Sequence, residues 1–163
     1  MLKAKFVILF RLLIKQEGAN TITFGADNGI MPGPGTFTAE LLSDNPEKGL
    51  SKMFDNDDNT CYEITGKTIA NFIWENQEPL SIGRYNIKFG NDDSKRPKGM
   101  VFYGSNDGNN WDYLIGIGGE PCMPDIDEVF PSQTRYKFIK LEINTTEDRT
   151  AMAVSEFRMT AAE

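Results

Sequence analysis

The side chains best suited to chemistry lie in one acidic segment, SKMFDNDDNTCYEI, which spans residues 51–64. It holds four acidic residues, two asparagines and a threonine, all of which offer oxygen atoms. Asp55, Asp57 and Thr60 stand at spacings of two and five. In a tight loop this spacing can turn side-chain oxygens toward one point, while backbone carbonyls complete the roughly six to eight ligands that calcium prefers. The segment therefore predicts a calcium site.

Two other interpretations concern the same segment. A calcium-binding EF-hand is excluded, because its sixth and twelfth loop positions, counted from Asp55, hold Thr60 and Gly66 instead of glycine and glutamate. A solvated acidic loop stays open as the alternative, with the Thr60 hydroxyl capping a turn and no ion bound.

Composition excludes several classes of chemistry. The chain of 163 residues has no histidine, which rules out Ser-His and Cys-His nucleophile pairs and histidine zinc sites. Cys61 and Cys122 are too few for an all-cysteine zinc site; they either pair or stay as free, partly buried thiols, and the domain size favours free thiols. The net charge of -7 would repel a phosphate backbone, so we expect no nucleic-acid partner.

The elements that must position the acidic segment are short strands. Runs such as ANFIWEN, KGMVFYGS and RYKFIKLEI are rich in aromatic and β-branched residues, and each is bounded by Gly, Pro, Asn or Asp. No segment keeps a helical period over three turns. The pattern predicts a single all-β domain over residues 1–163, an antiparallel sandwich or barrel with a jelly roll among the candidates.

The amino-terminal run MLKAKFVILFRLLIKQ has two interpretations. Lysines before an apolar stretch are typical of a signal peptide, but Arg11 interrupts the stretch and no small-residue cleavage pattern precedes Asn20. A membrane span would need about 20 apolar residues. Over residues 5–15 every even position is apolar, as on the buried face of a strand. We therefore predict a buried strand there, with neither a convincing signal peptide nor a membrane span.

The most specific stretch is RPKGMVFYGSNDGNNWDYLIGI, residues 96–117. A strand over 100–103 should enter a tight turn at 105–108, and Trp111 should begin the return strand and pack into the core. This stretch resembles the signature of coagulation factor 5/8 type C (discoidin) domains, which belong to the galactose-binding-like jelly-roll superfamily. The resemblance implies an antiparallel jelly-roll β-sandwich.

Two further segments match the same family in the right order, LSKMFDNDDNTCYE and RYKFIKLEINTTEDRTAMAVSEFRM. The match covers about residues 42–159, so 41–160 form the family core and 1–40 an additional amino-terminal strand region. This chain departs from the family pattern in having Asn56 where glycine is usual and Tyr62 where tryptophan is usual, and it lacks the terminal cysteines of extracellular animal members.

The resemblance also implies a ligand set for a structural calcium ion: Asp55, Asp57, Thr60, the backbone carbonyl of Lys52, and Glu156 from the last strand. On this interpretation Met53 and Phe54 anchor the loop in the core, and Asp58 and Asn59 are spacers that face solvent. Glu156 comes from the opposite end of the chain, so the ion would tie the two ends of the domain together.

The resemblance places a ligand site in the loops at one end of the sandwich. In sugar-binding members an exposed aromatic ring stacks on the sugar, while Arg, Asn or Asp bonds its hydroxyl groups. The candidates in this chain are Trp74, Arg84, Asn91, Asp92 and Arg96. The alternatives are a core position for Trp74 and a merely solvated loop for NDDSKRPKG.

The function that fits these observations is a non-catalytic module recognising carbohydrate or another surface ligand, as part of a larger surface or virion assembly. The alternative is a purely structural phage virion protein, a capsid decoration or tail component that docks other subunits through the sandwich. An enzyme, such as a glycosidase with two carboxylates about 5 to 9.5 Å apart, is disfavoured because no motif indicates one. The expected location is an extracellular surface or a virion.

Overall fold

The computed structural model describes residues 14–16, 20–118, 121–131 and 133–163. These residues form twelve strands and two short 3-10 helices. The strands are β1 (Ile14–Gln16), β2 (Thr21–Phe24), β3 (Gly35–Ala39), β4 (Tyr62–Thr65), β5 (Ile69–Leu80), β6 (Ile82–Lys88), β7 (Gly99–Ser105), β8 (Asp112–Gly118), β9 (Asp125–Val129), β10 (Tyr136–Asn144), β11 (Ala151–Val154) and β12 (Glu156–Ala161). The helices are η1 (Pro46–Lys48) and η2 (Leu50–Phe54).

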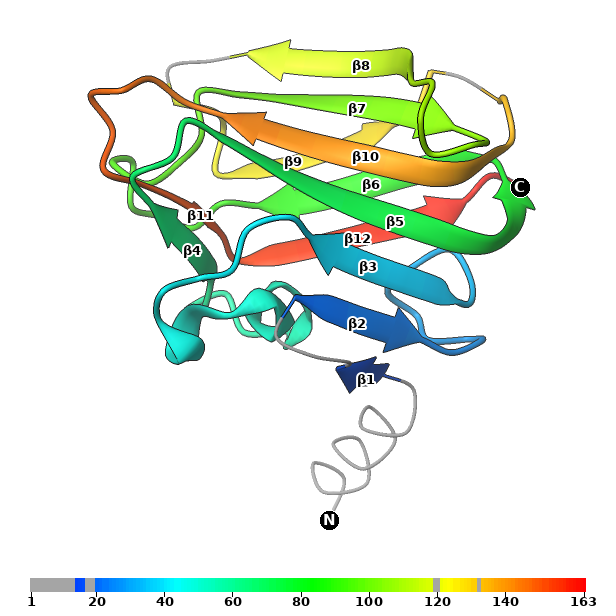
Figure 1. Ribbon diagram of the computed structural model, residues 1–163, viewed down its shortest axis with the longest axis horizontal. Coiled ribbons are helices and arrows are strands. Elements are labelled where there is room, and N and C mark those ends of the chain that lie inside the picture. Colours follow the sequence, from blue (N-terminus) through cyan, green and yellow to red (C-terminus); the bar gives the residue numbers. More distant parts are fainter. Residues whose placement is uncertain (1–13, 17–19, 119–120, 132) are drawn as a thin grey trace.

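The strands form two layers and a small closing pair (Figure 1). One layer is a seven-stranded sheet in the order β1-β2-β3-β5-β10-β7-β8, and the other is the three-stranded sheet β12-β6-β9. Strands β11 and β4 pair at one end. Every described pairing is antiparallel. The predicted all-β, antiparallel jelly-roll sandwich is therefore confirmed.

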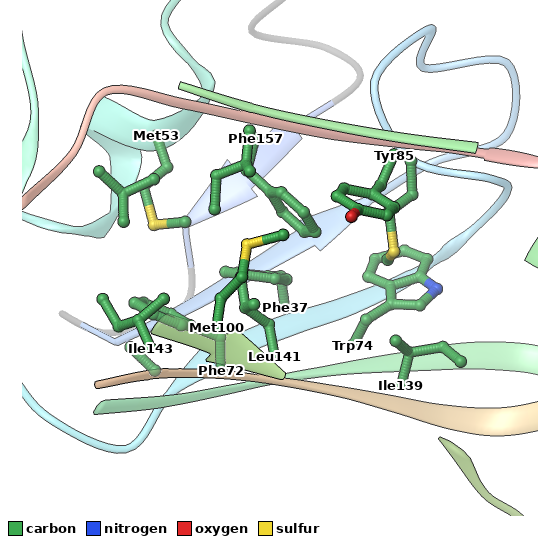
Figure 2. Packing of buried hydrophobic residues seen from close by; sticks show 14 of the residues in the cluster. Phe37, Met53, Phe72, Trp74, Tyr85, Met100, Ile139, Leu141, Ile143 and Phe157 are labelled. Carbon is green, nitrogen blue, oxygen red and sulfur yellow. The ribbon is translucent and has the colours of Figure 1, made fainter. Parts of the chain in front are cut away.

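Alternation along the strands creates the core between the layers. In β5, Ala70, Phe72 and Trp74 are buried while the residues between them are more exposed. Figure 2 shows Trp74 and Phe72 pointing into the space between the layers, together with Tyr85 and Phe157 from the other sheet. Each large apolar side chain removed from water in this way contributes about 1.5 to 3 kcal/mol.

The amino-terminal region adds strands to the seven-stranded sheet. Of the strand predicted over 5–15, residues 14 and 15 belong to β1, which pairs with β2, and the remainder lies outside the described residues. Strands β2 and β3 continue the sheet toward β5. Within the described part of the chain, no helix has the length and apolar character needed to cross a bilayer.

The hairpin of β7 and β8 differs in one respect from the prediction. Its turn contains Gly108 at a φ of 75°, and the hydroxyl of Ser105 accepts hydrogen bonds from the backbone of Asp107 and Gly108. The expectation that Trp111 packs into the core is wrong. Trp111 precedes β8 and is only half-buried, because its ring packs instead against the ammonium of Lys140, 4.6 Å from the ring centre.

Both cysteines are free thiols, as the size of the domain favoured. Cys61 is half-buried beside the acidic loop, and Cys122 is fully buried. Burial raises the pKa of each thiol, so both stay protonated and unreactive at neutral pH.

Candidate polar site at the loop end

The acidic loop begins on a hydrophobic anchor. Met53 and Phe54, in η2, are 0% and 2% exposed. The Phe54 ring makes edge contacts with Phe24 and Phe37, at centre-to-centre distances of 5.1 and 5.0 Å. The loop that follows is thereby fixed to the core, as its sequence predicted.

Asn56 takes the turn that glycine makes in the family pattern. Its φ is 58°, in the left-handed region that asparagine tolerates better than most side chains. Its Oδ1 accepts a hydrogen bond of 2.7 Å from Nη2 of Arg158 in β12. Asparagine therefore keeps the turn and adds a contact between the loop and the last strand.

The side chains of three predicted ligands, Asp55, Thr60 and Glu156, meet close to the backbone of Asp57. The Thr60 hydroxyl donates to Oδ2 of Asp55 at 2.6 Å. The backbone N–H of Asp57 donates both to Oδ1 of Asp55, at 3.1 Å, and to Oε1 of Glu156, at 3.0 Å. Residues 99 positions apart in the sequence, Asp57 and Glu156, thus meet through one amide.

The Glu156 carboxyl is in an unusual electrostatic position. It is 3% exposed. Burial, followed by the hydrogen bond and the negative charge of Asp55, raises the pKa of Glu156 to about 8. Two carboxyl groups in contact in a protected site need a proton or a cation between them. Asp55, Thr60 and Glu156 therefore supply the kind of oxygen donors that fit a hard cation.

Two of the predicted ligands stay predictions, the Asp57 carboxylate and the backbone carbonyl of Lys52. Oδ1 of Asp57 accepts hydrogen bonds from the backbone and side chain of Asn59, which leaves Oδ2 for an ion. The ammonium of Lys52 lies 4.0 Å from Oδ2 of Asp55. Among the described residues, no three acidic or cysteine side chains gather as a ready-made metal set.

A small polar hollow lies beside this loop. It measures about 230 Å³ and is lined by Asp58, Lys88, Gly90, Asn91, Pro124, Asp125 and Ser155. Asp58 is exposed, as predicted for a spacer, and both of its carboxylate oxygens accept hydrogen bonds of 3.0 Å from Lys88. We call these seven residues the polar hollow.

Of the residues predicted to bind a ligand, only Asn91 lines the polar hollow. Asp92 is occupied in shaping the same loop, since its Oδ1 accepts hydrogen bonds from the backbone and hydroxyl of Ser94. These bonds lower the pKa of Asp92. Arg96 is held to the chain by a hydrogen bond of 3.2 Å to the carbonyl of Cys122 and by an ion pair with Asp93.

Trp74 and Arg84 lie elsewhere. Trp74 is 0% exposed and donates its Nε1–H to Oδ1 of Asn76 at 2.6 Å, so its ring offers no face to a ligand. Arg84 forms an exposed ion pair of 2.6 Å with Asp127. It precedes Lys88 by four residues along β6, about 13 Å in a strand, which separates it from the polar hollow.

An ion-pair cluster fixes the loop that carries Asn91. Oε2 of Glu63, in β4, accepts from the ammonium groups of Lys95 and Lys48, each at 2.9 Å. Burial alone would raise the pKa of Glu63, but the hydrogen bonds from the two lysines outweigh it and lower that pKa. The backbone of Lys95 also accepts a hydrogen bond from Ala153 in β11. The loop is therefore held in place before any ligand arrives.

Sequence reasoning missed a group of aromatic side chains on the surface, of which Tyr113 is exposed and two are half-buried. Tyr103, Trp111 and Tyr113 lie around Lys140 on the outer face of the seven-stranded sheet, away from the loop end. Alternation in KGMVFYGS carries a usable signal for Tyr103, because Met100 and Phe102 face the core and Tyr103 must face outward. No comparable signal marks Tyr113.

Comparison with known proteins identifies the fold. No family model matches the chain, and no curated protein is significantly similar to it. Among solved structures, a GH29 fucosidase from Ruminococcus gnavus in complex with fucose matches 79% of the chain at a TM-score of 0.65 and 18% identity. The match covers 26% of the fucosidase, so this chain spans about a quarter of that protein.

Two isolated modules match over nearly their whole length. A CBM32 module from Clostridium perfringens, in complex with GalNAc-β-1,3-galactose, matches at a TM-score of 0.62 and 14% identity, over 77% of this chain and 94% of the module. A chitosan-binding module from Paenibacillus matches at a TM-score of 0.61 and 15% identity, over 76% of this chain and 92% of that module. The chain therefore has the discoidin, or galactose-binding-like, fold of these carbohydrate-binding modules.

Proposed function

We propose that this protein is a non-catalytic carbohydrate-binding module and that the polar hollow takes one sugar unit of a glycan. The observation that carries the proposal is the lining of the polar hollow, in which Lys88 and Asn91 offer hydrogen-bond donors while Asp58, Asn91 and Asp125 offer acceptors. Sugar hydroxyl groups both donate and accept, so a lining of this mixed kind suits them. The shared fold with carbohydrate-binding modules supports the same conclusion.

The lining is held ready for a ligand. Nδ2 of Asn86 donates to Oδ1 of Asp125 at 2.6 Å, and Lys88 is paired with Asp58. Side chains that are already positioned lose less conformational entropy when a ligand binds. At about 230 Å³ the hollow is smaller than a typical drug-sized pocket of roughly 300 Å³ or more, which favours a single sugar unit over a longer bound segment.

The acidic pair beside the hollow does not have the arrangement of a glycosidase. The two carboxyl groups of a retaining enzyme stand about 5 to 5.5 Å apart with the sugar between them. Asp55 and Glu156 are instead hydrogen-bonded to each other, and Glu156 is buried. Burial and the neighbouring Asp55 carboxyl account for the raised pKa of Glu156 without a role in acid catalysis.

Calcium belongs to the same proposal as a structural ion. Asp55, Thr60 and Glu156 would hold it, with the carbonyl of Lys52 and the segment at Asp57 completing the set. The ion would supply positive charge between two carboxylates and join the loop to β12; this chain's own residues would do the recognition. The close contact of the Asp55 and Glu156 carboxyls supports it.

The experiment for glycan binding is an array screen followed by calorimetry. GalNAc-β-1,3-galactose and fucose are the first probes, and Asn91→Ala and Asp125→Ala should each weaken the binding of whichever of these two sugars binds more tightly about tenfold. Asn109→Ala is the matched control, because Asn109 is exposed in the β7–β8 turn and lines no part of the hollow. Unchanged affinity in both hollow variants would refute the location, and no binder on the array would refute the function.

A structural role in a virion or surface assembly is the second candidate. The observation that favours it is the position of β8, which in the described part of the chain pairs with β7 alone and leaves one sheet edge open. An assembly protein should form concentration-dependent oligomers in light-scattering measurements and bind no glycan. A monomer that binds a glycan would exclude this candidate.

A further inference from the structure

Three aromatic rings and one cation form a cluster on the outer face of the seven-stranded sheet. Tyr103 in β7 pairs in register with Lys140 in β10 on one side and with Tyr113 in β8 on the other. The Lys140 ammonium lies 4.6 Å from the ring centres of both Tyr103 and Trp111. The rings of Tyr103 and Tyr113 are 6.3 Å apart and meet edge to face. We call these four residues the aromatic platform.

A β-bulge places Tyr113 on this face. The register of β7 and β8 shifts between Phe102 and Tyr103, so that Phe102 faces Ile115 while Tyr103 faces Tyr113. Regular alternation would put Tyr113 on the core side of the sheet, where Ile115 and its cross-strand partner, the buried Phe102, lie. The extra residue, Leu114, turns Tyr113 outward, which is a recognised use of bulges near binding sites.

Two glycines of β8 shape the surroundings of Tyr113. A Cβ atom added at Gly116 would come within 2.9 Å of the Tyr113 hydroxyl, so the tyrosine side chain lies across Gly116. A Cβ at Gly118 would meet no atom within 4 Å. Tyr113 is 65% exposed. Its ring therefore rests on the strand with one face open to solvent.

The polar groups of the cluster are nearly balanced in charge. Lys140 forms no ion pair with any described residue, since its ammonium is held by the two rings. Glu142 lies two residues further along the same face of β10, and burial together with its charge raises the pKa of Tyr103. With a net charge of -7 on the whole chain, a polyanionic ligand would be repelled.

We propose that the aromatic platform is a second carbohydrate-binding surface, one that takes an extended neutral glycan of β-linked sugars. Such sugars present a flat C–H face that packs on the Tyr113 ring, and hydroxyl groups at their edges that reach Lys140 and Glu142. Lys140 and Tyr113 lie two strands apart, about 10 Å, which is a span for more than one sugar ring. The proposal shares with the proposed function only the premise that the chain binds carbohydrate.

The test is calorimetric titration of the whole chain with cellohexaose, with hexagalacturonate as the acidic counterpart. Tyr113→Ala should weaken cellohexaose binding about tenfold, and Gly116→Val should do the same by displacing the ring without removing it. Asn91→Ala should leave it unchanged. Because Trp74 is buried, a change in tryptophan fluorescence on adding cellohexaose would report contact near Trp111.

The outcomes separate this proposal from the proposed function. If GalNAc-β-1,3-galactose or fucose binds through the polar hollow while cellohexaose does not bind, the aromatic platform is refuted and the hollow stands. Cellohexaose binding that survives Tyr113→Ala, or falls equally in Asn91→Ala, also refutes the platform. Preference for hexagalacturonate would refute the neutral glycan. If no glycan binds at all, both proposals fail.

Discussion

The polar hollow and the aromatic platform would recognise ligands by opposite means within one sandwich. The hollow is assembled from loops and strand ends that are distant in sequence, and it offers charged and amide groups. The platform comes mainly from one hairpin, and it offers ring faces around a single lysine. Hydrogen bonds in the hollow would select the arrangement of hydroxyl groups, whereas stacking on the platform would select flat sugars of many kinds.

The two regions also differ in how they depend on the rest of the fold. The hollow adjoins the Asp55–Glu156 contact, which joins the two ends of the described core, so an ion bound there would affect both stability and binding. The platform residues lie on the surface of a sheet whose opposite face is the core. We therefore expect the loop end to respond to calcium and pH, and the platform to respond to neither.

The largest expected effect is that of calcium on stability. Calcium at about one hundred times its dissociation constant should stabilise the wild type by about 2.7 kcal/mol, measured as an increase in urea midpoint over an EDTA-treated sample. Glu156→Gln should abolish the gain, and Tyr113→Ala should keep it. No stabilisation of the wild type, together with no copurified metal, would contradict the calcium site.

The second effect is a dependence of stability on pH in EDTA. Because the pKa of Glu156 is raised from 4.5 to about 8, the folded state binds this proton more tightly than the unfolded state. The stability that Glu156 contributes is therefore complete below pH about 4.5 and is lost as the pH rises through about 8. Melting temperatures recorded across this range should fall for the wild type and fall less for Glu156→Gln. A calcium-saturated sample should lose the slope, and an equal slope in both proteins would count against the assignment.

The third effect is a crossed loss of affinity. Asn91→Ala should weaken the sugar that binds the hollow about tenfold and leave cellohexaose unchanged, while Tyr113→Ala should do the reverse. Calorimetry on the four combinations of protein and ligand checks this. If both variants weaken both ligands, the two regions form one site and the comparison fails.

The smallest effect concerns the ion pair that borders the hollow. Lys88→Met should cost about 0.5 kcal/mol or less of unfolding free energy, because Asp58 is well exposed and such pairs are screened by water and salt. The loss in binding free energy for the sugar should exceed the loss in unfolding free energy, since Lys88 also lines the hollow. Denaturant titration and calorimetry on the same variant give both numbers, and a large loss of stability without loss of affinity would make Lys88 purely structural.

Sequence patterns predicted the fold and part of the loop end. The three short family segments together predicted the jelly roll. The apolar pair Met53 and Phe54 predicted that the acidic loop is anchored in the core. The contact of Glu156 with Asp57 followed only from the resemblance, because no local pattern links residues so far apart. The role of Asp57 as a carboxylate ligand stays a prediction, and sequence does not show that Oδ1 of its side chain bonds the backbone of Asn59.

The aromatic platform escaped prediction for a different reason. Period-two alternation determines which side chains face outward only while the register is regular, and the bulge at Leu114 reverses the direction of Tyr113. Trp111 was expected in the core because large aromatic residues are usually buried, but a neighbouring lysine on the surface covers its ring instead. Both errors arise from contacts that form only when β7, β8 and β10 come together.

The measurement that tests the glycan proposal most directly is nuclear magnetic resonance titration of isotope-labelled protein with GalNAc-β-1,3-galactose and with fucose. The account predicts saturable shifts of the backbone amides of Lys88, Asn91 and Asp125, with those of Gly116 and Tyr113 unmoved. The absence of any saturable shift around the polar hollow, with GalNAc-β-1,3-galactose or fucose shown by calorimetry to bind the protein, would contradict it.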